Sequence, residues 1–226
     1  MNFRMKHCSI LILAVGLVAA ALYAQAQKMV PVPIEVPIPG YEGTPVNFRG
    51  IPNLEKEAIL PRGPFLAPAG VKNVAQGKKV TGKEMNPMMG ELSMITDGDT
   101  TQVDGNYVEL GPGMQWVQID LESPQEIYGV LIWHYFQPRV YFCTIVQTAD
   151  DAGFTKNVQT WFNNDNGNKL KLGAGKDQNY VDTNEGKLVS TKGVRARYVR
   201  LYSNGNSAND LNNYIEVAVY GRPPAK

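Results

Sequence analysis

The residues best placed to do chemistry are two aspartates that flank a glycine, Asp97 and Asp99, in the stretch I-T-D-G-D at 95–99. Two carboxylates this close repel each other unless a cation lies between them or water screens their charges. Three interpretations follow: a solvated turn, a catalytic pair or a cation site. The catalytic pair is disfavoured, because hydrolases place their two carboxylates on separate elements that face a cleft, whereas these two lie on one turn.

Calcium is the cation that this donor set favours. Ca²⁺ takes several oxygen ligands from carboxylates, carbonyls and water. Asp97 and Asp99 supply two carboxylates, Gly98 permits a tight turn between them, and Thr101 adds a hydroxyl or carbonyl oxygen. The stretch lacks the glycine and glutamate spacing of an EF-hand. The sequence therefore predicts a structural Ca²⁺ site, with a solvated turn as the alternative, since Asp and Gly are common turn residues.

Side chains suited to enzyme catalysis are scarce. Beyond residue 26 the chain holds one histidine, His134, and one cysteine, Cys143. A His-rich zinc site is therefore impossible, and a Ser-His-Asp triad would have to use His134. Cys143 lies in an apolar segment and is expected to be a small buried hydrophobic residue rather than a nucleophile. The sequence predicts that the protein is not an enzyme, with catalysis through His134 as an alternative.

A second set of candidates suits sugar recognition, which needs a flat aromatic ring for the apolar sugar face and planar polar groups for the hydroxyls. W-H-Y-F-Q-P-R at 133–139 and F-N-N-D-N at 162–166 offer both where strands turn into loops. The candidate ligand-binding residues are His134, Tyr135, Phe136, Arg139, Asn163 and Asn164. Each also has a structural interpretation: core packing for the histidine, an ion pair for the arginine, and turn formation for the asparagines.

The elements that must position these residues are expected to be β-strands. Hydrophobic and polar residues alternate at 115–121, 197–202 and 214–220, and period-two alternation is typical of half-buried strands. The segments 127–136 and 140–147 are apolar on both faces, which predicts central strands. Turn signals rich in Asn and Gly separate these segments, and no long stretch has helical periodicity. The predicted fold class is all-β, an antiparallel β-sandwich.

The N-terminal part carries an export signal and a proline-rich segment. Arg4 and Lys6 precede an apolar run at 10–22 and the sequence A-Q-A at 24–26, which together describe a signal peptide at 1–26. The apolar run is shorter than the ~20 residues of a membrane-spanning helix. The expected location is therefore secreted, periplasmic or at the cell surface, with no transmembrane segment after cleavage.

Recurrent prolines at 27–70 favour extended geometry, so this segment is predicted to be a polyproline-II-like tether. Docking of part of this arm on the domain is the alternative. The remaining ranges are predicted as a sandwich domain at 71–222 and a tail at 223–226.

The charge balance excludes some partners. Removing residues 1–26 takes away two basic residues and no acidic ones, which leaves 20 Lys and Arg against 21 Asp and Glu. A non-specific nucleic-acid binder needs a basic field, so no nucleic-acid partner is expected. With a single cysteine left, no intramolecular disulfide is possible, and the domain must rely on its core.

Five segments occur in the order found in a known family. They are N-V-A-Q-G-K-K-V-T at 73–81, I-T-D-G-D at 95–99, Q-W-V-Q-I-D-L at 115–121, A-R-Y-V-R-L-Y-S at 196–203 and Y-I-E-V-A-V-Y-G at 214–221. This run resembles the discoidin domain, also called the coagulation factor 5/8 type C domain, and is close to carbohydrate-binding module family 32. The resemblance covers roughly 71–222.

The resemblance implies a galactose-binding-like jelly-roll sandwich whose loops at one end bind ligands, commonly sugars. It also implies that the Asp-Gly turn shares a structural Ca²⁺ with a glutamate of the last strand, which matches Glu216. Many animal members join the ends of the domain by a cysteine pair, so the lone Cys143 favours the bacterial carbohydrate-module branch. An insertion at 103–113, between the acidic turn and the strand at 115–121, departs from the family pattern.

These inferences converge on a secreted, non-catalytic module that binds a carbohydrate or glycoconjugate. The alternative function is a structural or cell-adhesion module that binds an extracellular protein or matrix partner.

Overall fold

The computed structural model describes most of the chain after the predicted signal peptide. The described residues are 28–39, 48, 50–56, 61–135 and 139–225. The signal peptide predicted at 1–26 and the candidate residue Phe136 lie outside them. The chain divides into two compact units. The described residues of the smaller unit are 28–33 and 64–71, and those of the larger unit are 34–39, 48, 50–56, 61–63, 72–135 and 139–225.

The smaller unit is a pair of short antiparallel strands, β1 (Met29–Pro31) and β2 (Leu66–Pro68). The backbone N–H of Val32 donates to the carbonyl of Phe65 at 2.8 Å and so extends the pairing. Proline lacks an N–H donor and is tolerated at strand ends, where Pro31 and Pro68 stand. The ends of the segment predicted as an extended tether thus pair with each other.

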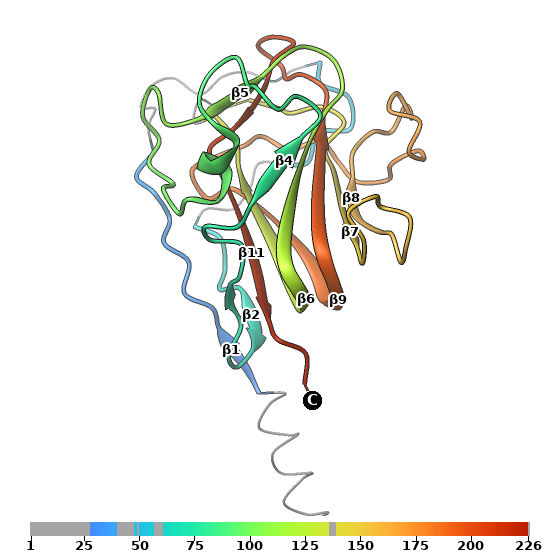
Figure 1. Cartoon of the computed structure of the whole chain (residues 1–226). Coiled ribbons are helices and arrows are strands. Elements are labelled where there is room, and N and C mark those ends of the chain that lie inside the picture. Colours follow the sequence, from blue (N-terminus) through green and yellow to red (C-terminus); the bar gives the residue numbers. More distant parts are fainter. Residues whose placement is uncertain (1–27, 40–47, 49, 57–60, 136–138, 226) are drawn as a thin grey trace, which may run out of the picture. The chain divides into compact units, whose positions relative to one another are not determined.

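The larger unit is built on a seven-stranded antiparallel sheet (Figure 1). Its strands are β3 (Lys72–Asn73), β4 (Val80–Gly82), β6 (Gln115–Trp133), β7 (Ile145–Ala149), β8 (Gln159–Asn163), β9 (Lys187–Ser203) and β11 (Glu216–Arg222). The order is β3-β11-β6-β9-β7-β8, and β4 also pairs with β6. A separate pair joins β5 (Val108–Leu110) to β10 (Asn212–Tyr214), and a 3-10 helix, η1, covers Leu92–Thr96. The predicted all-β antiparallel sandwich is confirmed.

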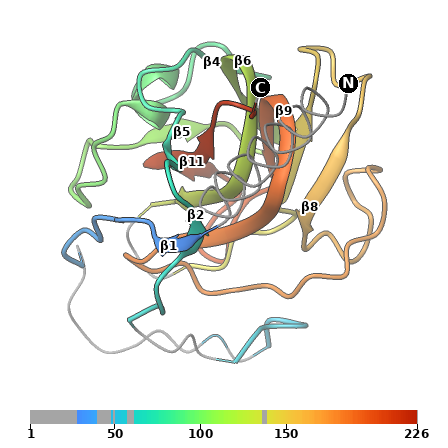
Figure 2. The ribbon, with the colours of Figure 1, turned by 90° about the horizontal axis from the view of Figure 1, so that it is seen from below.

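The two longest strands, β6 and β9, pair along nearly their whole length and curve together, as Figure 2 shows. Their ladder is interrupted near Glu122 and Lys192, which both have positive φ, 66° and 54°. Each strand is thereby divided into two halves. Ile119 in the first half of β6 and Ile132 in the second are both fully buried in the same hydrophobic core. Side chains from both halves therefore enclose one interior.

The alternation read from the sequence matches the observed burial of the apolar residues, but Gln118, on the predicted polar face, is also buried. Val117, Ile119 and Leu121 are buried, whereas Asp120 between them is half-exposed. All five residues of β7 are buried, as expected of a strand that lies between β9 and β8. No helix in the described part of the chain is long and apolar enough to cross a membrane.

Residues of the proline-rich arm that belong to the larger unit contact its loops. Leu54 forms a parallel bridge with Asn179, and the backbone N–H of Glu55 donates to the Asn179 carbonyl at 2.8 Å. The carboxylate of Glu55 also pairs with Lys187 at 3.0 Å. Further along, an Arg62 Nη1–H donates to the Glu185 carbonyl at 2.8 Å. The boundary predicted at residue 71 stays a prediction, but Leu54, Glu55 and Arg62 of the arm contact residues of the sandwich.

Gly186 lies in the turn before β9, and a substitution there tests how closely this turn packs against β6. Its φ is +66°, and a Cβ there would lie 2.7 Å from the carbonyl oxygen of Ile132 in β6. Gly186→Ala is expected to lower the free energy of unfolding by about 2–4 kcal/mol, through strain at positive φ and displacement of the neighbouring strand. Denaturant unfolding measures the change.

Gly105 is the matched control, because its φ is also positive, +88°, but nothing lies within 4 Å of the added Cβ. Gly105→Ala should carry only the conformational penalty, about 1–2 kcal/mol. Equal losses in the two variants would contradict the close approach of Gly186 to β6.

Candidate functional site

The acidic turn predicted to bind a cation follows η1 directly. Asp97 is the C-cap residue of this helix, and Gly98 turns the chain with a φ of +89°. The Asp97 side chain accepts a hydrogen bond from the backbone N–H of Asp99 at 2.8 Å, and Asp99 accepts one from Thr101 at 2.8 Å. A hydrogen bond from the Thr101 side chain, followed by the one from its backbone N–H, lowers the pKa of Asp99. Both carboxylates thus accept hydrogen bonds from backbone N–H groups of their own exposed turn.

Glu216, the predicted partner from the last strand, lies against this turn. It is the first residue of β11 and is 1% exposed. Its Oε2 accepts a hydrogen bond from the backbone N–H of Gly98 at 3.2 Å, and its buried Oε1 has no partner among the described residues. Burial, followed by repulsion from Asp97 and Asp99, raises the pKa of Glu216 to about 8. The structure therefore brings Asp97, Asp99 and Glu216 to one place.

The negative charge of this arrangement suits a cation, but its carboxylates do not surround a metal ion by themselves. A positive ion would offset the mutual repulsion and supply a partner for Glu216 Oε1. However, the described residues contain no group of three or more His, Cys, Asp or Glu side chains placed to hold a metal ion by themselves. The carbonyl of Thr101 already accepts a hydrogen bond from Asn106 at 2.8 Å. Backbone oxygens and water would have to complete the coordination of a calcium ion.

His134 is a buried packing residue in this structure. Its ring stacks on Tyr141 at 4.1 Å and lies 5.1 Å from Tyr214, and its exposed fraction is 2%. Nδ1 is hydrogen-bonded to the Asp182 carboxylate, while Nε2 has no hydrogen-bond partner within the described residues. A His–Asp pair is part of a catalytic triad, but the nucleophile would have to bond to Nε2. The geometry agrees with the structural interpretation of His134.

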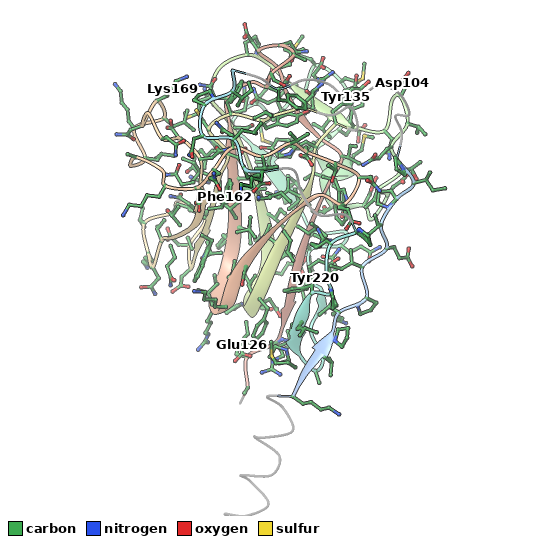
Figure 3. All side chains as sticks on the ribbon, turned by 180° about the vertical axis from the view of Figure 1, so that it is seen from behind. Asp104, Glu126, Tyr135, Phe162, Lys169 and Tyr220 are labelled. Atoms are coloured by element: carbon green, nitrogen blue, oxygen red, sulfur yellow. The ribbon has the colours of Figure 1, made fainter. Side chains whose placement is uncertain are left out.

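Next to this buried pair lies a partly exposed cluster of Tyr135, Arg139, Tyr107 and Asp104, here called the tyrosine–arginine cluster. The Arg139 guanidinium carbon lies 4.6 Å from the centre of the Tyr135 ring, which packs edge-on against Tyr107 at 4.5 Å. The Tyr135 hydroxyl donates to the Asp104 carboxylate at 3.2 Å. Figure 3 shows Tyr135 and Asp104 at the end of the sandwich opposite Glu126.

Sequence reasoning identified two members of the tyrosine–arginine cluster and missed two. Tyr135 and Arg139 stand in the predicted segment 133–139, whereas Tyr107 and Asp104 belong to the insertion at 103–113. The pKa of Tyr107 is raised by burial and then by the charges of Glu109 and Asp104. One signal in the sequence could have identified them. The insertion at 103–113 contains an aromatic residue and an acidic residue, and insertions usually form loops.

Asn163 and Asn164 are buried and organise the loop that follows β8. Asn163 donates from Nδ2 to the Gly173 carbonyl at 3.0 Å and accepts the N–H of Asp165 at 2.9 Å. Asn164 donates from Nδ2 to the Tyr141 carbonyl at 3.2 Å. These contacts match the turn-forming alternative, and a role of either side chain in ligand binding stays a prediction.

No protein-family model and no curated protein matches the sequence. Solved structures do match its fold. The family 89 glycoside hydrolase from Clostridium perfringens, in complex with 2-acetamido-1,2-dideoxynojirmycin, matches with a TM-score of 0.50 and 22% identity over 67% of this chain. The match covers only 15% of the hydrolase.

Two smaller proteins match with lower scores. The chitosan-binding module 1 of a chitosanase/glucanase from Paenibacillus sp. IK-5 has a TM-score of 0.48 and 19% identity, over 66% of this chain and 99% of the module. The family 32 carbohydrate-binding module of AlyQ, in complex with 4,5-unsaturated mannuronic acid, has a TM-score of 0.45 and 20% identity, over 62% of this chain and 92% of the module. These two do not by themselves establish a shared fold. The match to the hydrolase shows that this chain shares the fold of one segment of that protein.

Proposed function

We propose that the protein is a secreted, non-catalytic module that binds a carbohydrate or glycoconjugate through the tyrosine–arginine cluster. The observation that supports this function most is the contact of an arginine with a tyrosine ring at the loop end of the sandwich. Tyrosine rings provide apolar surface for a sugar ring, and guanidinium and carboxylate groups form charge-assisted hydrogen bonds with hydroxyls. Tyr135, Arg139 and Asp104 place all three kinds of group within reach of one ligand.

Two further observations agree with a binding role rather than a catalytic one. His134 is buried away from solvent, and Asp97 and Asp99 lie on one turn instead of on two sides of a cleft. The hydrolase with the similar fold has been solved in complex with GlcNAc-alpha-1,4-galactose, but the match covers only 16% of that chain. Its catalytic activity is therefore not part of this proposal. Export through the signal peptide predicted at 1–26 would bring the module to extracellular glycans.

The second part of the proposal is that Ca²⁺ stabilises the module. Asp97, Asp99 and Glu216 would supply carboxylate oxygens, and Thr101 would supply a further oxygen. The support is the buried Oε1 of Glu216, which has no partner among the described residues although it belongs to an acid close to two others. Bound calcium would join the turn after η1 to the start of β11.

Arg139→Ala tests the ligand site. The variant should lose sugar affinity at least about tenfold, or about 1.4 kcal/mol, because the guanidinium that lies over the Tyr135 ring is removed. Titration calorimetry against a panel of galactosides and polysaccharides measures the loss on whichever sugar the unmodified protein binds.

Arg195→Ala is the matched control for that measurement. Arg195 is exposed and pairs in register with Glu126, at the end of the sandwich opposite Tyr135. Its removal should leave sugar affinity unchanged. If no sugar on the panel binds while an extracellular protein is captured, the structural or adhesion function replaces the proposed one.

Calcium removal tests the second part. If Ca²⁺ binds only the folded state, a hundredfold excess over Kd stabilises the protein by about 2.7 kcal/mol. EDTA should therefore lower the melting temperature, and Ca²⁺ but not Mg²⁺ should restore it. An unchanged melt, together with no calcium in elemental analysis of the purified protein, would contradict the site.

The pH dependence of the free energy of unfolding gives an independent measure of the pKa of Glu216. Its pKa in the folded state, about 8, exceeds the ordinary value of 4.5, so the folded state holds the proton more tightly than the unfolded state does. Without calcium, this group's contribution is fully present below pH 4.5 and is lost as the pH rises through 8. The change is on the order of 5 kcal/mol, at about 1.4 kcal/mol for each unit of pKa difference.

Chemical unfolding in EDTA, repeated at pH values from about 5 to about 9, measures how the free energy of unfolding depends on pH. Glu216→Gln, which has no titratable group, should flatten it, and saturating Ca²⁺ should also flatten it in the unmodified protein. The same slope in the Gln variant would show that other groups are responsible.

A further inference from the structure

Two Asn-Gly dipeptides occur in the chain, Asn166-Gly167 and Asn204-Gly205. An asparagine followed by glycine is prone to deamidation, because glycine has no Cβ to hinder the attack of its backbone nitrogen on the preceding side-chain amide. The attack closes a five-membered succinimide ring and expels ammonia. It requires an accessible asparagine and a glycine N–H that is not held in a hydrogen bond, and the two dipeptides differ in both respects.

The glycine nitrogen is engaged in one dipeptide and not in the other. The backbone N–H of Gly205 donates to Oδ1 of Asn212 at 3.0 Å, and Gly205 is buried. The N–H of Gly167 has no hydrogen-bond partner within the described residues, and both Asn166 and Gly167 are exposed. The structure therefore leaves Asn166-Gly167 open to ring closure and protects Asn204-Gly205.

The Asn166 side chain joins the loop that follows β8 to the proline-rich arm. Its Nδ2 donates to the carbonyls of Gly175 and Asp177, at 3.1 Å each. Its Oδ1 accepts a hydrogen bond from Nδ2 of Asn53 in the arm at 2.9 Å. Nδ2 of Asn53 also donates to the Asp177 carbonyl, at 3.2 Å. One exposed amide thus holds the loop closed and contacts the arm at the same place.

We propose that Asn166-Gly167 is a site of spontaneous deamidation, and that the modification detaches the arm at Asn53 from the loop that follows β8. The Gly167 nitrogen loses its proton and bonds to Cγ of Asn166, the bond from Cγ to Nδ2 breaks, and Nδ2 leaves as ammonia. Water then opens the ring to aspartate or isoaspartate, so that one amide and one water become a carboxylate and an ammonium ion. This inference does not depend on the proposed carbohydrate function.

The effect on the arm follows from the change of hydrogen-bonding groups. A carboxylate only accepts hydrogen bonds, so the new oxygen repels the carbonyls of Gly175 and Asp177 that the amide had held. Isoaspartate also lengthens the main chain by one bond. The arm is bound beside this point by two backbone bonds, from Glu55 to the Asn179 carbonyl at 2.8 Å and from Asn179 to the Asn53 carbonyl at 2.9 Å. These bonds weaken when the loop opens.

Arm docking and deamidation therefore oppose each other. While the arm is docked, its contact with Oδ1 helps to fix the Asn166 side chain, and ring closure needs that side chain to move. Undocking frees the amide to react, and the product no longer closes the loop on which the arm docks. The reaction thus turns a reversible undocking into a permanent one.

The test is to incubate the purified full chain at mildly alkaline pH and to follow its peptides by mass spectrometry, which detects the replacement of NH2 by OH. The Asn166 peptide should convert at least about tenfold faster than the Asn204 peptide of the same chain. Gly167→Ala is the matched variant, since an added Cβ would meet only the Lys169 side chain, at 3.8 Å, and φ at this position is not positive. It should keep the fold and slow conversion at least about tenfold.

Hydrogen exchange of the converted chain reports the release of the arm. The backbone N–H groups of Glu55 and Asn179 should exchange faster than in the fresh protein, while β6 and β9 keep their protection. Asn53→Ala, which removes the arm's contact with the amide, should speed conversion. The proposal is overturned if both Asn-Gly peptides convert at the same rate, if Gly167→Ala converts as fast as the unmodified chain, if Asn53→Ala leaves the rate unchanged, or if the converted chain retains the protection of Glu55 and Asn179.

Discussion

The pairing of β6 with β9 is the interaction on which the rest of the structure depends. These strands share the longest ladder in the described residues, and β4, β7 and β11 all pair with one or the other. Cross-strand pairing fixes register, and a slip by one residue would turn every buried side chain to the opposite face. The register of β6 and β9 therefore sets which side chains enter the core and where each loop begins.

The same ladder explains why the candidate sites lie where they do. β6 ends at Trp133, so His134 and Tyr135 follow at the end of the sandwich. Trp133 also pairs in register with Glu216, the first residue of β11. One strand end thus leads into the tyrosine–arginine cluster and also sets the position of the buried glutamate beside the acidic turn.

Burial of Glu216 has a definite electrostatic effect. A carboxylate removed from water and placed close to Asp97 and Asp99 binds its proton more tightly, unless a cation compensates for the charge. The pKa of about 8 has this cause, and Oε1 has no hydrogen-bond partner among the described residues. The two aspartates have a different environment, because each is exposed and accepts a hydrogen bond from a backbone N–H group of its own turn.

Much of the fold could be predicted from local pattern. Alternation at 115–121 identified the buried apolar residues Val117, Ile119 and Leu121 of β6, because period two is a property of the strand itself, but it did not identify the burial of Gln118. Glu216 could be placed beside the acidic turn only through the family resemblance, since 118 residues separate it from Gly98. The burial of His134 depends on rings contributed by Tyr141 and Tyr214, and no local pattern shows such contacts.

The hydrogen bond from the Asp182 backbone to the Arg139 carbonyl, 2.8 Å long, links the surface cluster to the interior. The side chain of the same residue holds His134. Redesigning this end of the molecule for another ligand therefore faces unequal constraints. Tyr107 and Asp104 offer positions open to change, whereas altering His134 or Asp182 would disturb the scaffold together with the recognition surface.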